Sequence, residues 1–400
     1  MKNIKLLLIT NLFPNPAEPN RGIFVADMVK EMRNTVDVTV ISPIPLFPRW
    51  KALKRFERWY RFSLIPADYM IDGHEVVCPK YIAIPKMGFL HSFFLFVALL
   101  PTVMRLHKSK RFDLINAHWL FPDGIAACWI AKILHIPIVL SAHGCDINFY
   151  LDMPLRRKQI MNALKRADLI TVVSGKQKEK LCKAGFADSK ITVINNGFGS
   201  DFTIQDRTDR RKELNLDVRQ KIIIFVGRLV EVKGFDRLIK AIKQLESSLQ
   251  DDFELAVVGD GPLRQRYEDE VSRYGLSHRI KFYGEKDHSQ IYKWFGASDL
   301  MCLPSLSEGC PTVVLEALAC GKPVVAARVG EIPELVNEKN GILVNAGDIS
   351  ELSASLSAAL KKGWKEDEIR RSVSELSWKA AAEKYRDVFQ KVIARRSGTV

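Results

Sequence analysis

Glu308 and Glu316 stand at a spacing that could bind a ligand rich in hydroxyl groups. Seven residues separate them, and a helix is predicted to begin between them, because Thr312 is a good N-cap and apolar residues recur at helical spacing after it. This places Glu308 on a loop and Glu316 inside the helix, about one turn further on. Carboxylates in these positions accept hydrogen bonds from a polyol. On the spacing alone, an ordinary loop glutamate followed by one on a solvated helix face remains the alternative.

The loop and the first turn of this helix form a candidate phosphate site. The first N–H groups of a helix have no acceptor within the helix, and the helix dipole favours an anion beside them. A ligand that carries both phosphate and hydroxyl groups therefore fits the stretch as a whole. The residues expected to surround its phosphate are Gly309, Cys310, Pro311, Thr312 and Val313.

A second loop could supply two cations to the same kind of ligand. The apolar strand 222–226 is followed by the segment GRLVEVKG, which holds Arg228 and Lys233 five residues apart. Two cations at the end of a strand, with a helix after them, can neutralise one diphosphate. The segment lacks the Gly-x4-Gly-Lys-Ser/Thr pattern of a P-loop. Two ordinary surface cations are the alternative.

The stretch Leu303–Ala327, LPSLSEGCPTVVLEALACGKPVVAA, resembles the Glu-x7-Glu element of the family 4 retaining glycosyltransferases of the bacterial surface-polysaccharide type. The resemblance implies that Glu308 contacts hydroxyls of the donor sugar and that Glu316 holds the ribose of a sugar nucleotide. It also implies that Arg228 and Lys233 neutralise the donor diphosphate. The co-substrate would be a nucleoside-diphosphate sugar, with a UDP-sugar as the first choice.

The reaction implied by this family is transfer of the sugar with retention of configuration at its anomeric carbon. The acceptor attacks from the face that the diphosphate leaves, and the departing phosphate takes the acceptor proton. Glu308 and His143 would position the sugar and stabilise an oxocarbenium-like state, so both are predicted catalytic residues together with Arg228 and Lys233. Because the chain has no Asp-x-Asp triple, we expect no metal ion across the diphosphate and no other cofactor.

Two residues of the first half, Gly22 and His143, extend the resemblance. Gly22 ends a loop rich in Pro and Asn after the first strand, where the family has a glycine close to the donor phosphates. Arg21 stands where the first glycine of a pair is common. His143 lies in the sequence AHGCD, which is similar to a family loop facing the acceptor and the reacting carbon. His118 also follows a strand end, and we expect it on the acceptor face, with a structural role as the alternative.

Two further residues of the second half are predicted to contact the donor. Gly259 begins a turn, Gly259–Pro262, that the family shares, directly after the strand 253–258. Tyr283 follows the strand 280–282, in the region where the family places the nucleotide base. Core packing of the Tyr283 ring is an equal alternative.

Strands and helices alternate through both halves, which predicts an α/β protein with parallel sheets. The resemblance adds the GT-B fold, in which two Rossmann-like domains face each other across a cleft. We expect residues 1–200 to form the acceptor domain and residues 201–376 to form the nucleotide-sugar domain. Residues 377–400 are expected to form a helix that returns to the first domain.

The positive charge of the chain is concentrated in its first half. The whole chain has a formal charge of +14, and residues 1–200 hold 28 Lys and Arg against 15 Asp and Glu, a balance of +13. An anionic membrane surface, a phosphorylated acceptor or a nucleic acid could be the partner. Arg49–Phe62 is predicted to be a basic amphipathic helix of the kind that lies in a membrane interface, with packing on the domain as the alternative. Its basic face comprises Lys51, Lys54, Arg55, Arg58 and Arg61.

We expect a cytoplasmic protein that can also bind peripherally to the inner face of the cell membrane. The seven cysteines are scattered and include no Cys-x2-Cys pair, which is typical of a reduced compartment. The N-terminus has too few apolar residues for a signal peptide. The apolar run Phe93–Met104 is about 12 residues long and contains Pro101, so we predict no transmembrane helix.

Two other functions fit parts of the sequence. A sugar-nucleotide 2-epimerase with the GT-B fold would bind the same donor but would need no acceptor domain. A nucleic-acid-binding protein would explain the charge of the first half, but no binding module is visible and the basic residues are not interleaved with a stacking platform. We therefore expect a transferase whose partners are a nucleotide sugar and a glycan or lipid-linked acceptor, and we expect no nucleic acid.

Overall fold

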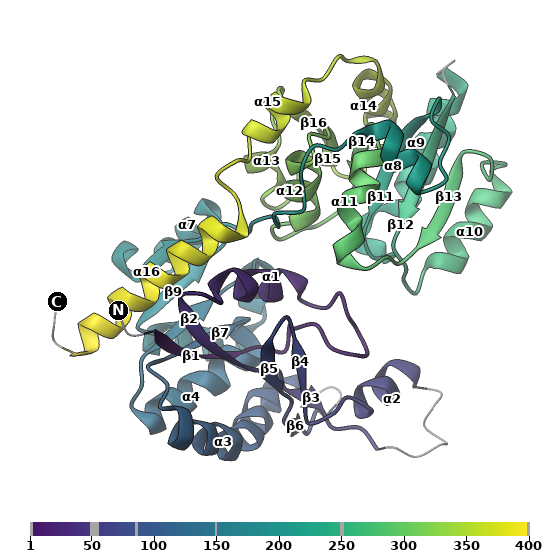
Figure 1. The fold of residues 1–400 in the computed structure, drawn as a ribbon. Coiled ribbons are helices and arrows are strands. Elements are labelled where there is room, and N and C mark those ends of the chain that lie inside the picture. The colour runs from purple at the N-terminus through teal and green to yellow at the C-terminus, as the bar shows by residue number, and fades with distance from the viewer. Residues whose placement is uncertain (1–2, 49–55, 85–86, 149, 249–251, 398–400) are drawn as a thin grey trace. The chain divides into compact units, whose positions relative to one another are not determined.

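The computed structural model describes residues 3–48, 56–84, 87–148, 150–248 and 252–397. The chain forms two compact units, coloured in sequence order in Figure 1. The N-terminal unit comprises Met1–Asn196 together with Trp378–Val400, and the C-terminal unit comprises Gly197–Ser377. The divisions expected from the sequence, after residues 200 and 376, lie within a few residues of these limits.

The described part of the N-terminal unit is built on an eight-stranded sheet with the order β10-β9-β8-β7-β1-β2-β5-β4. Neighbouring strands are parallel except β4 and β5, which pair antiparallel at one edge. β1 reads IKLLLI because both faces of a parallel sheet are covered by other elements. The strands are β1 (Ile4–Ile9), β2 (Val36–Ile41), β4 (Asp68–Ile71), β5 (His74–Val77), β7 (Leu114–His118), β8 (Ile138–Ser141), β9 (Leu169–Val172) and β10 (Ile191–Val193).

Helices on the two faces of this sheet enclose two hydrophobic cores. One core contains Leu95 of α3, Ile130 of α4 and Ile160 of α6. The other contains Val29 of α1 and Phe389 of α16, so the C-terminal helix returns to this unit as predicted and lies beside α1 in Figure 1. The helices are α1 (Ile23–Met32), α2 (Glu57–Ser63), α3 (His91–Lys110), α4 (Ile125–Leu134), α5 (Cys145–Asn148), α6 (Pro154–Arg166), α7 (Gly175–Lys183) and α16 (Trp378–Ser397). β3 (Ile44–Pro45) and β6 (Lys80–Tyr81) form a separate short ribbon.

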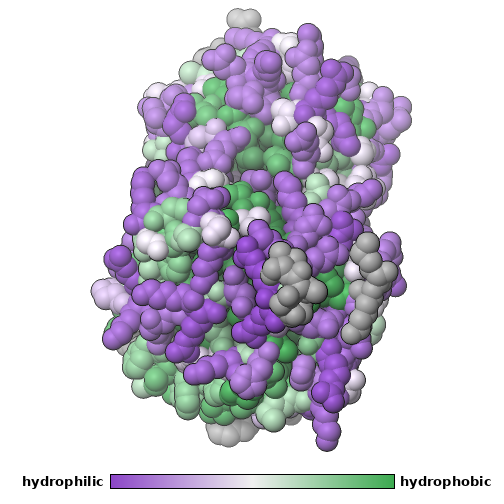
Figure 2. Space-filling model, turned by 90° about the vertical axis from the view of Figure 1, so that its left-hand side faces the viewer, coloured by the Kyte–Doolittle hydropathy of each residue, from purple (hydrophilic) through white to green (hydrophobic). Residues whose placement is uncertain are grey.

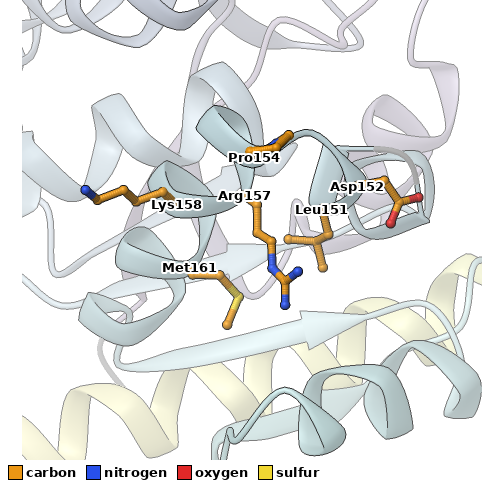
Figure 3. Close-up of a pocket in the computed structure, with 6 residues that line it drawn as sticks. All are labelled: Leu151, Asp152, Pro154, Arg157, Lys158 and Met161. Carbon is orange, nitrogen blue, oxygen red and sulfur yellow. The ribbon is translucent and has the colours of Figure 1, made fainter.

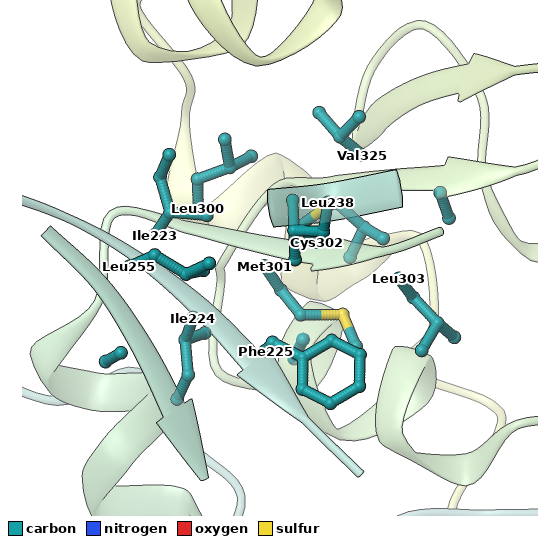
Figure 4. Packing of buried hydrophobic residues seen from close by; sticks show 14 of the residues in the cluster. Ile223, Ile224, Phe225, Leu238, Leu255, Leu300, Met301, Cys302, Leu303 and Val325 are labelled. Carbon is teal, nitrogen blue, oxygen red and sulfur yellow. The ribbon is translucent and has the colours of Figure 1, made fainter. Parts of the chain in front are cut away.

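The described part of the C-terminal unit has a parallel sheet with the order β13-β12-β11-β14-β15-β16. Figure 4 shows apolar residues of neighbouring strands packed together with Leu238 of α9. The strands are β11 (Lys221–Val226), β12 (Phe253–Val258), β13 (Ile280–Gly284), β14 (Leu300–Leu303), β15 (Val324–Ala327) and β16 (Gly341–Val344). The helices are α8 (Arg207–Glu213), α9 (Phe235–Ser248), α10 (Arg264–Arg273), α11 (His288–Ala297), α12 (Thr312–Ala319), α13 (Ile332–Leu335), α14 (Ile349–Lys361) and α15 (Glu366–Arg371).

Each sheet has a point at which successive connections run in opposite directions. β1 lies between β2 and β7, and β11 lies between β12 and β14. Loops at the carboxyl ends of such neighbouring strands diverge and leave room for a ligand. In the C-terminal unit these two loops carry Arg228 and Glu308. In the N-terminal unit they carry the segment before α1 and the residues after His118.

The helix around Pro101 is longer than the apolar run of about 12 residues on which the prediction of no transmembrane helix was based. The helix continues through polar residues on both sides of that run, so α3 has 20 residues, with Pro101 inside it. By length and composition alone, Gly88–Lys110 could cross a membrane, because a window of 18 residues within it has a mean hydropathy of 1.8. One face of α3 nevertheless belongs to the core of the N-terminal unit.

Candidate functional site

Lys233 and Glu308 form an ion pair that joins two loops of the C-terminal unit. Lys233 ends a short turn after β11, and Glu308 lies in the loop after β14. Lys233 Nζ lies 2.6 Å from Glu308 Oε1, and the hydroxyl of Ser305 donates to the same oxygen at 2.6 Å. A backbone bond of 2.8 Å from Leu306 N–H to the carbonyl of Val232 fastens the two loops together. Two predicted donor-site residues therefore meet although 75 positions separate them in the chain.

Arg228 extends from the end of β11 as an exposed cation. Among the residues that the structure describes, its guanidinium has no hydrogen-bond or ion-pair partner. The neighbouring loop supports its backbone, because Gly259 approaches Gly227 so closely that a Cβ on Gly259 would lie 2.0 Å from the Gly227 carbonyl oxygen. Glycine is therefore required at position 259, and backbone bonds from Gly227 N–H to Val258 and from Leu229 N–H to Asp260 join the two loops. Within the described residues, the unpaired Arg228 and the carboxylate-bound Lys233 lie at the same sheet edge.

The helix start predicted as a phosphate site is present, one residue away from the expected cap. α12 begins at Thr312, so Pro311, whose backbone is extended, occupies the N-cap position in place of Thr312. No side chain caps this end, so the first N–H groups of α12 remain available to an anion. Gly309, Cys310 and Val313 are partly exposed around it. The loop–helix geometry predicted for Glu308 and Glu316 is confirmed.

Glu316 is buried inside α12 and bonded to a histidine that the sequence did not single out. His288 Nε2 lies 3.0 Å from Glu316 Oε1, and its ring lies 5.5 Å from the ring of Phe202. His288 begins α11, directly after the loop that follows β13. A histidine just past a strand end was the signal that could have found it, as it found His143.

Tyr283 packs within the C-terminal unit. Its hydroxyl donates to Glu254 Oε1 at 2.7 Å, and its ring centroid lies 4.7 Å from that of Trp294. Burial, followed by the bond to Glu254, raises the pKa of Tyr283 above its usual range. These contacts favour the core-packing alternative over stacking on a nucleotide base.

Gly22 is the residue at which the loop after β1 turns into α1. It has φ 60° at the N-cap of α1, and a Cβ there would lie 2.4 Å from the carbonyl oxygen of Leu12. Arg21, which stands in place of the usual first glycine, folds back on its own loop. Its Nε donates to the carbonyl of Asn11 at 2.9 Å, and its Nη1 lies 2.9 Å from Glu18 Oε2. The loop is therefore braced by a side chain and depends on glycine at its last position.

The two predicted histidines of the N-terminal unit belong to one chain of hydrogen bonds. His118 Nδ1 lies 2.8 Å from His143 Nε2, and His118 Nε2 lies 2.7 Å from Asn116 Oδ1. Asn116 Nδ2 donates to the carbonyl of Val139 at 3.1 Å and to the hydroxyl of Ser141 at 2.9 Å. This series of hydrogen bonds begins at Val139 and Ser141 in β8, passes through Asn116 and His118 at the end of β7, and ends at His143 in the loop after β8.

These hydrogen bonds determine which ring nitrogens of the two histidines carry hydrogen. A carbonyl oxygen only accepts, so the amide nitrogen of Asn116 must face Val139 and its oxygen must accept from His118 Nε2–H. His118 Nδ1 is then bare, and His143 Nε2 must carry the hydrogen that it donates. His143 Nδ1 is left with a lone pair, and this atom is buried and has no hydrogen-bond partner within the described residues.

His118 was predicted on the acceptor face, and the structure corrects this placement. The residue is fully buried, with its ring stacked between those of His143 at 4.9 Å and Tyr385 of α16 at 5.9 Å. It faces inward because α16 packs over the end of β7 and β8. His143 itself is half-buried, with the Phe24 ring of α1 at 4.8 Å. His118 therefore lies on the buried side of His143, holds its Nε2 by a hydrogen bond, and does not reach the surface.

Burial keeps both imidazoles neutral. It lowers the pKa of His143 to about 3, and it lowers the pKa of His118 well below its usual value, with the neighbouring His143 as the second cause. Asp146 holds the His143 loop, because its Oδ1 accepts from the N–H groups of His143 and Gly144 at 3.0 Å each. Burial raises the pKa of Asp146 to about 6, and these backbone bonds oppose the rise.

The predicted basic helix is described only in part, and its described cations do not form a free basic face. Lys51, Lys54 and Arg55 lie outside the described residues. Arg58 Nε lies 2.7 Å from Glu18 Oε1, and Arg61 donates to the carbonyl of Ala17. Both arginines are thus bound to the loop before α1. In the part of the chain that the structure describes, no group of three His, Cys, Asp or Glu side chains could hold a metal ion.

Comparison with known proteins assigns the chain to a family. A model described as Glycosyltransferase Family 4 matches residues 22–201, and one described as Glycosyl transferases group 1 matches residues 206–375. The putative teichuronic acid biosynthesis glycosyltransferase TuaC of Bacillus subtilis is 32% identical over 366 residues, which is 88% of each chain. N-acetyl-alpha-D-glucosaminyl L-malate synthase of Bacillus anthracis is 26% identical over 304 residues, covering 75% of this chain and 77% of its own.

Solved structures share the fold at lower identity. Sucrose-phosphate synthase of Thermosynechococcus elongatus aligns with a TM-score of 0.76 and 20% identity, over 98% of this chain and 100% of its own. HepE of Anabaena, solved with UDP and glucose, aligns with a TM-score of 0.71 and 22% identity, over 97% of this chain and 100% of its own. Because two family models and a relative that spans nearly the whole chain agree, the chain belongs to glycosyltransferase family 4 and has the GT-B fold.

Proposed function

We propose that this chain is a retaining, metal-independent glycosyltransferase that moves a sugar from a nucleoside-diphosphate sugar to a glycan or lipid-linked acceptor. The observation that carries the proposal is the 2.6 Å ion pair of Lys233 and Glu308 at the same sheet edge as Arg228 and the start of α12. Cations beside a carboxylate match a ligand that has a diphosphate at one end and sugar hydroxyls at the other.

Donor binding would rearrange this ion pair. The diphosphate competes with Glu308 for Lys233, because it brings more negative charge to the same ammonium group. Glu308 stays bonded to Ser305 and becomes free to accept hydrogen bonds from the sugar hydroxyls. Glu316, one turn inside α12, would take the hydroxyls of the ribose. In the absence of donor, the ion pair balances the two charges and keeps both loops in place.

The chemistry requires the leaving group to be stabilised. Breaking the bond between the anomeric carbon and the phosphate oxygen leaves negative charge on the diphosphate, which Arg228, Lys233 and the first N–H groups of α12 would stabilise. The acceptor oxygen bonds to the same carbon from the same face, and its proton passes to the departing phosphate. No protein base is needed in this scheme. His143, whose loop is held by Asp146, would help to position the sugar and to stabilise the oxocarbenium-like state.

The donor and the acceptor class are proposed from the relatives. Two Anabaena HepE structures of the same fold hold UDP, one of them with glucose, and this supports a UDP-sugar as the donor. TuaC is named for teichuronic acid biosynthesis, which supports an acceptor in cell-surface polysaccharide or glycolipid synthesis. Membership of a transferase family favours transfer over the epimerase and nucleic-acid-binding alternatives.

The proposal includes a cytoplasmic location with peripheral contact at the membrane. The six cysteines whose side chains are described are free thiols, four of them buried, and such residues suit a reduced compartment. A lipid-linked acceptor would present its sugar at the membrane surface, where a peripherally bound enzyme can reach it.

The first experiment is a thermal shift with UDP-, GDP-, ADP- and dTDP-sugars, each with and without EDTA. A ligand that binds only the folded state adds about 2.7 kcal/mol of stability at a hundred times its Kd. We expect one nucleotide sugar to raise the Tm, EDTA to leave the shift unchanged, and Glu316→Ala to remove it. The nucleotide sugar that raises the Tm is then assayed for sugar transfer to lipid-linked acceptors. Proton NMR determines the anomeric configuration of the product. An EDTA-sensitive shift, an inverted product or the absence of any shift would each contradict the proposal.

A further inference from the structure

His288 binds one oxygen of the Glu316 carboxylate in the interior of the C-terminal unit. The two side chains are 18% and 6% exposed, and His288 Nε2 lies 3.0 Å from Glu316 Oε1. Because an ionised carboxylate only accepts hydrogen bonds, His288 Nε2 must carry the hydrogen. Within the described residues, Glu316 Oε2 has no partner, and this atom is not enclosed, so a ligand can reach it. The histidine therefore orients the carboxylate and leaves its second oxygen available.

The imidazole of His288 is itself held by its surroundings. The buried ring of Phe202 lies 5.5 Å from the His288 ring and 6.4 Å from the ring of Phe295, further along α11. Arg370 Nη1 donates to the carbonyl of Phe202 at 2.9 Å, which ties this segment to α15. Packing and hydrogen bonding therefore fix the imidazole in the position from which it donates to Glu316.

Burial makes the hydrogen bonds of this carboxylate selective. A polar group at the surface can exchange a lost partner for water, and Figure 2 shows many hydrophilic residues on one face of the molecule. The hollow of about 530 Å³ in Figure 3 is of this kind, because Asp152, Arg157 and Lys158, which line it, are exposed. Water replaces a lost partner less readily at the buried Glu316. This residue therefore discriminates between ligands that supply a hydrogen bond and ligands that do not.

We propose that His288 is a positioning residue through which Glu316 selects ribonucleoside-diphosphate sugars over their deoxyribose counterparts. This inference rests on the proposed function, in which Glu316 takes hydroxyls of the ribose. Because His288 holds Oε1, the carboxylate presents its remaining acceptor positions to these hydroxyls in a fixed direction. A 2′-deoxyribose has one hydroxyl fewer and leaves an acceptor of this buried group unpaired. The donor class then comprises UDP-, GDP- and ADP-sugars and excludes dTDP-sugars.

Direct contact between His288 and the nucleotide is the competing explanation, and it makes a different prediction. A lost direct contact would weaken the binding of every nucleotide by the same factor. A lost positioning contact would weaken only the binding of nucleotides that carry the ribose hydroxyls. The geometry favours positioning, because Nε2 is bound to Glu316 and the ring packs against Phe202.

The test is isothermal titration calorimetry of the full-length protein with UDP and with 2′,3′-dideoxy-UDP, or with the matching pair for the base that the thermal shift selects. We expect the wild type to bind UDP at least about tenfold more tightly, as for the loss of a hydrogen bond to a charged group. His288→Phe keeps a ring beside Phe202 but has no hydrogen to donate, so this ratio should fall to about threefold or less. His288→Gln, whose Nε2 can donate, should retain most of the ratio.

The matched control is His278→Phe, which removes a similar contact at the other end of β13. His278 Nε2 lies 2.7 Å from Glu246 Oε1, but its side chain is 60% exposed and precedes β13, whereas His288 follows β13. This variant should keep the wild-type ratio, and the Tm of each variant reports its folding. Nitrogen-15 NMR of the wild type adds a measurement that needs no variant. The Nε2 signal of His288 should move on addition of UDP and much less on addition of 2′,3′-dideoxy-UDP.

The possible outcomes separate this inference from the proposed function. If His288→Phe keeps the wild-type ratio, if the wild type binds both nucleotides equally, or if both move the His288 signal alike, the inference is overturned and the transferase proposal stands. A dTDP-sugar as the preferred donor would do the same. The absence of binding by any nucleotide or nucleotide sugar would overturn both.

Discussion

His118 Nδ1 lies 2.8 Å from His143 Nε2, and the Asn116 amide behind His118 determines which of these two nitrogens carries the hydrogen. The backbone carbonyl of Val139 orients that amide, so a main-chain group of β8 sets the tautomer of a side chain in the loop that follows. His143 is left as a neutral ring with a bare Nδ1, because burial also lowers its pKa to about 3. The state of His143 is therefore a property of the fold around it.

Replacing His118 should change the tautomer of His143 and, through it, the rate of transfer. In His118→Phe the hydrogen on His143 Nε2 loses its acceptor, so it can move to Nδ1. In His118→Gln the amide oxygen can still accept it. We expect His118→Phe to lower kcat/KM by roughly five- to tenfold, as for the loss of one hydrogen bond, and His118→Gln to retain most of the activity.

Nitrogen-15 NMR of the imidazoles checks this prediction independently of activity. The wild type and His118→Gln should show hydrogen on Nε2 of His143, whereas His118→Phe should show a mixture. Equal Tm values would separate this effect from a loss of folding. The prediction fails if the tautomer of His143 is the same in all three proteins.

Arg228→Gln should lower kcat by roughly a hundredfold, because in the proposed mechanism Arg228 stabilises charge that develops on the leaving group. The Tm should stay unchanged, because Arg228 is exposed. Arg228→Lys keeps the charge but loses the planar fork, so it should recover part of the rate. The matched control is Arg266→Gln, an exposed arginine on α10 that should have wild-type kinetics. Steady-state kinetics with the donor identified by thermal shift provide the measurement. A full rate in Arg228→Lys would count against bidentate contact with the diphosphate.

Gly22→Ala should destabilise the N-terminal unit and weaken donor binding. A Cβ at this position, with φ 60°, would lie 2.4 Å from the Leu12 carbonyl, so the loop after β1 must move. We expect a loss of about 1–3 kcal/mol in the free energy of unfolding, measured by urea denaturation. Gly175→Ala is the control: it begins α7, and a Cβ there meets nothing within 4 Å. A Gly22→Ala protein as stable as Gly175→Ala would contradict the expectation.

Asp123 is a fully buried carboxyl in the segment after β7, where its Oδ2 accepts a 2.7 Å hydrogen bond from Asn11 Nδ2. It should make the protein less stable as the pH rises. Burial raises its pKa from 3.8 to about 8, so the folded state holds the proton more tightly than the unfolded state does. Its contribution to stability is fully present below pH 3.8 and is lost as the pH rises towards 8. The side chain of Asn in Asp123→Asn does not titrate. The free energy of unfolding of this variant, relative to that of the wild type, should therefore increase over this range, by at most roughly 1.4 kcal/mol per pH unit.

The measurement for Asp123 is the difference in unfolding free energy between wild type and Asp123→Asn at a series of pH values. Contributions from other groups, including the two histidines, cancel in this difference. The range from pH 4 to pH 8 is set by the ordinary pKa of this carboxyl, 3.8, and its pKa in the folded protein, about 8. A difference that stays constant over this range would show that Asp123 is ionised in the folded protein.

Much of the C-terminal unit could be predicted from local sequence. The apolar run of β11, the cations after it and the Glu-x7-Glu spacing are all contained in short stretches. Parallel strands are apolar because they are covered on both faces, and their loops carry the ligand-binding groups, so chain order alone brings Arg228 and Glu308 to one sheet edge. The pairing of Lys233 with Glu308 needed the register of β11 with β14 as well.

The placement of several side chains in the N-terminal unit could not be predicted in the same way. His118 reads as a ligand-facing residue from its position after a strand, but α16, more than two hundred and fifty residues later in the chain, covers it. Arg58 looks like part of a free basic face until Glu18, 40 residues earlier, binds it. Periodicity tells which residues share a face of an element. Which face is covered depends on contacts between distant segments, and only the packed fold decides it.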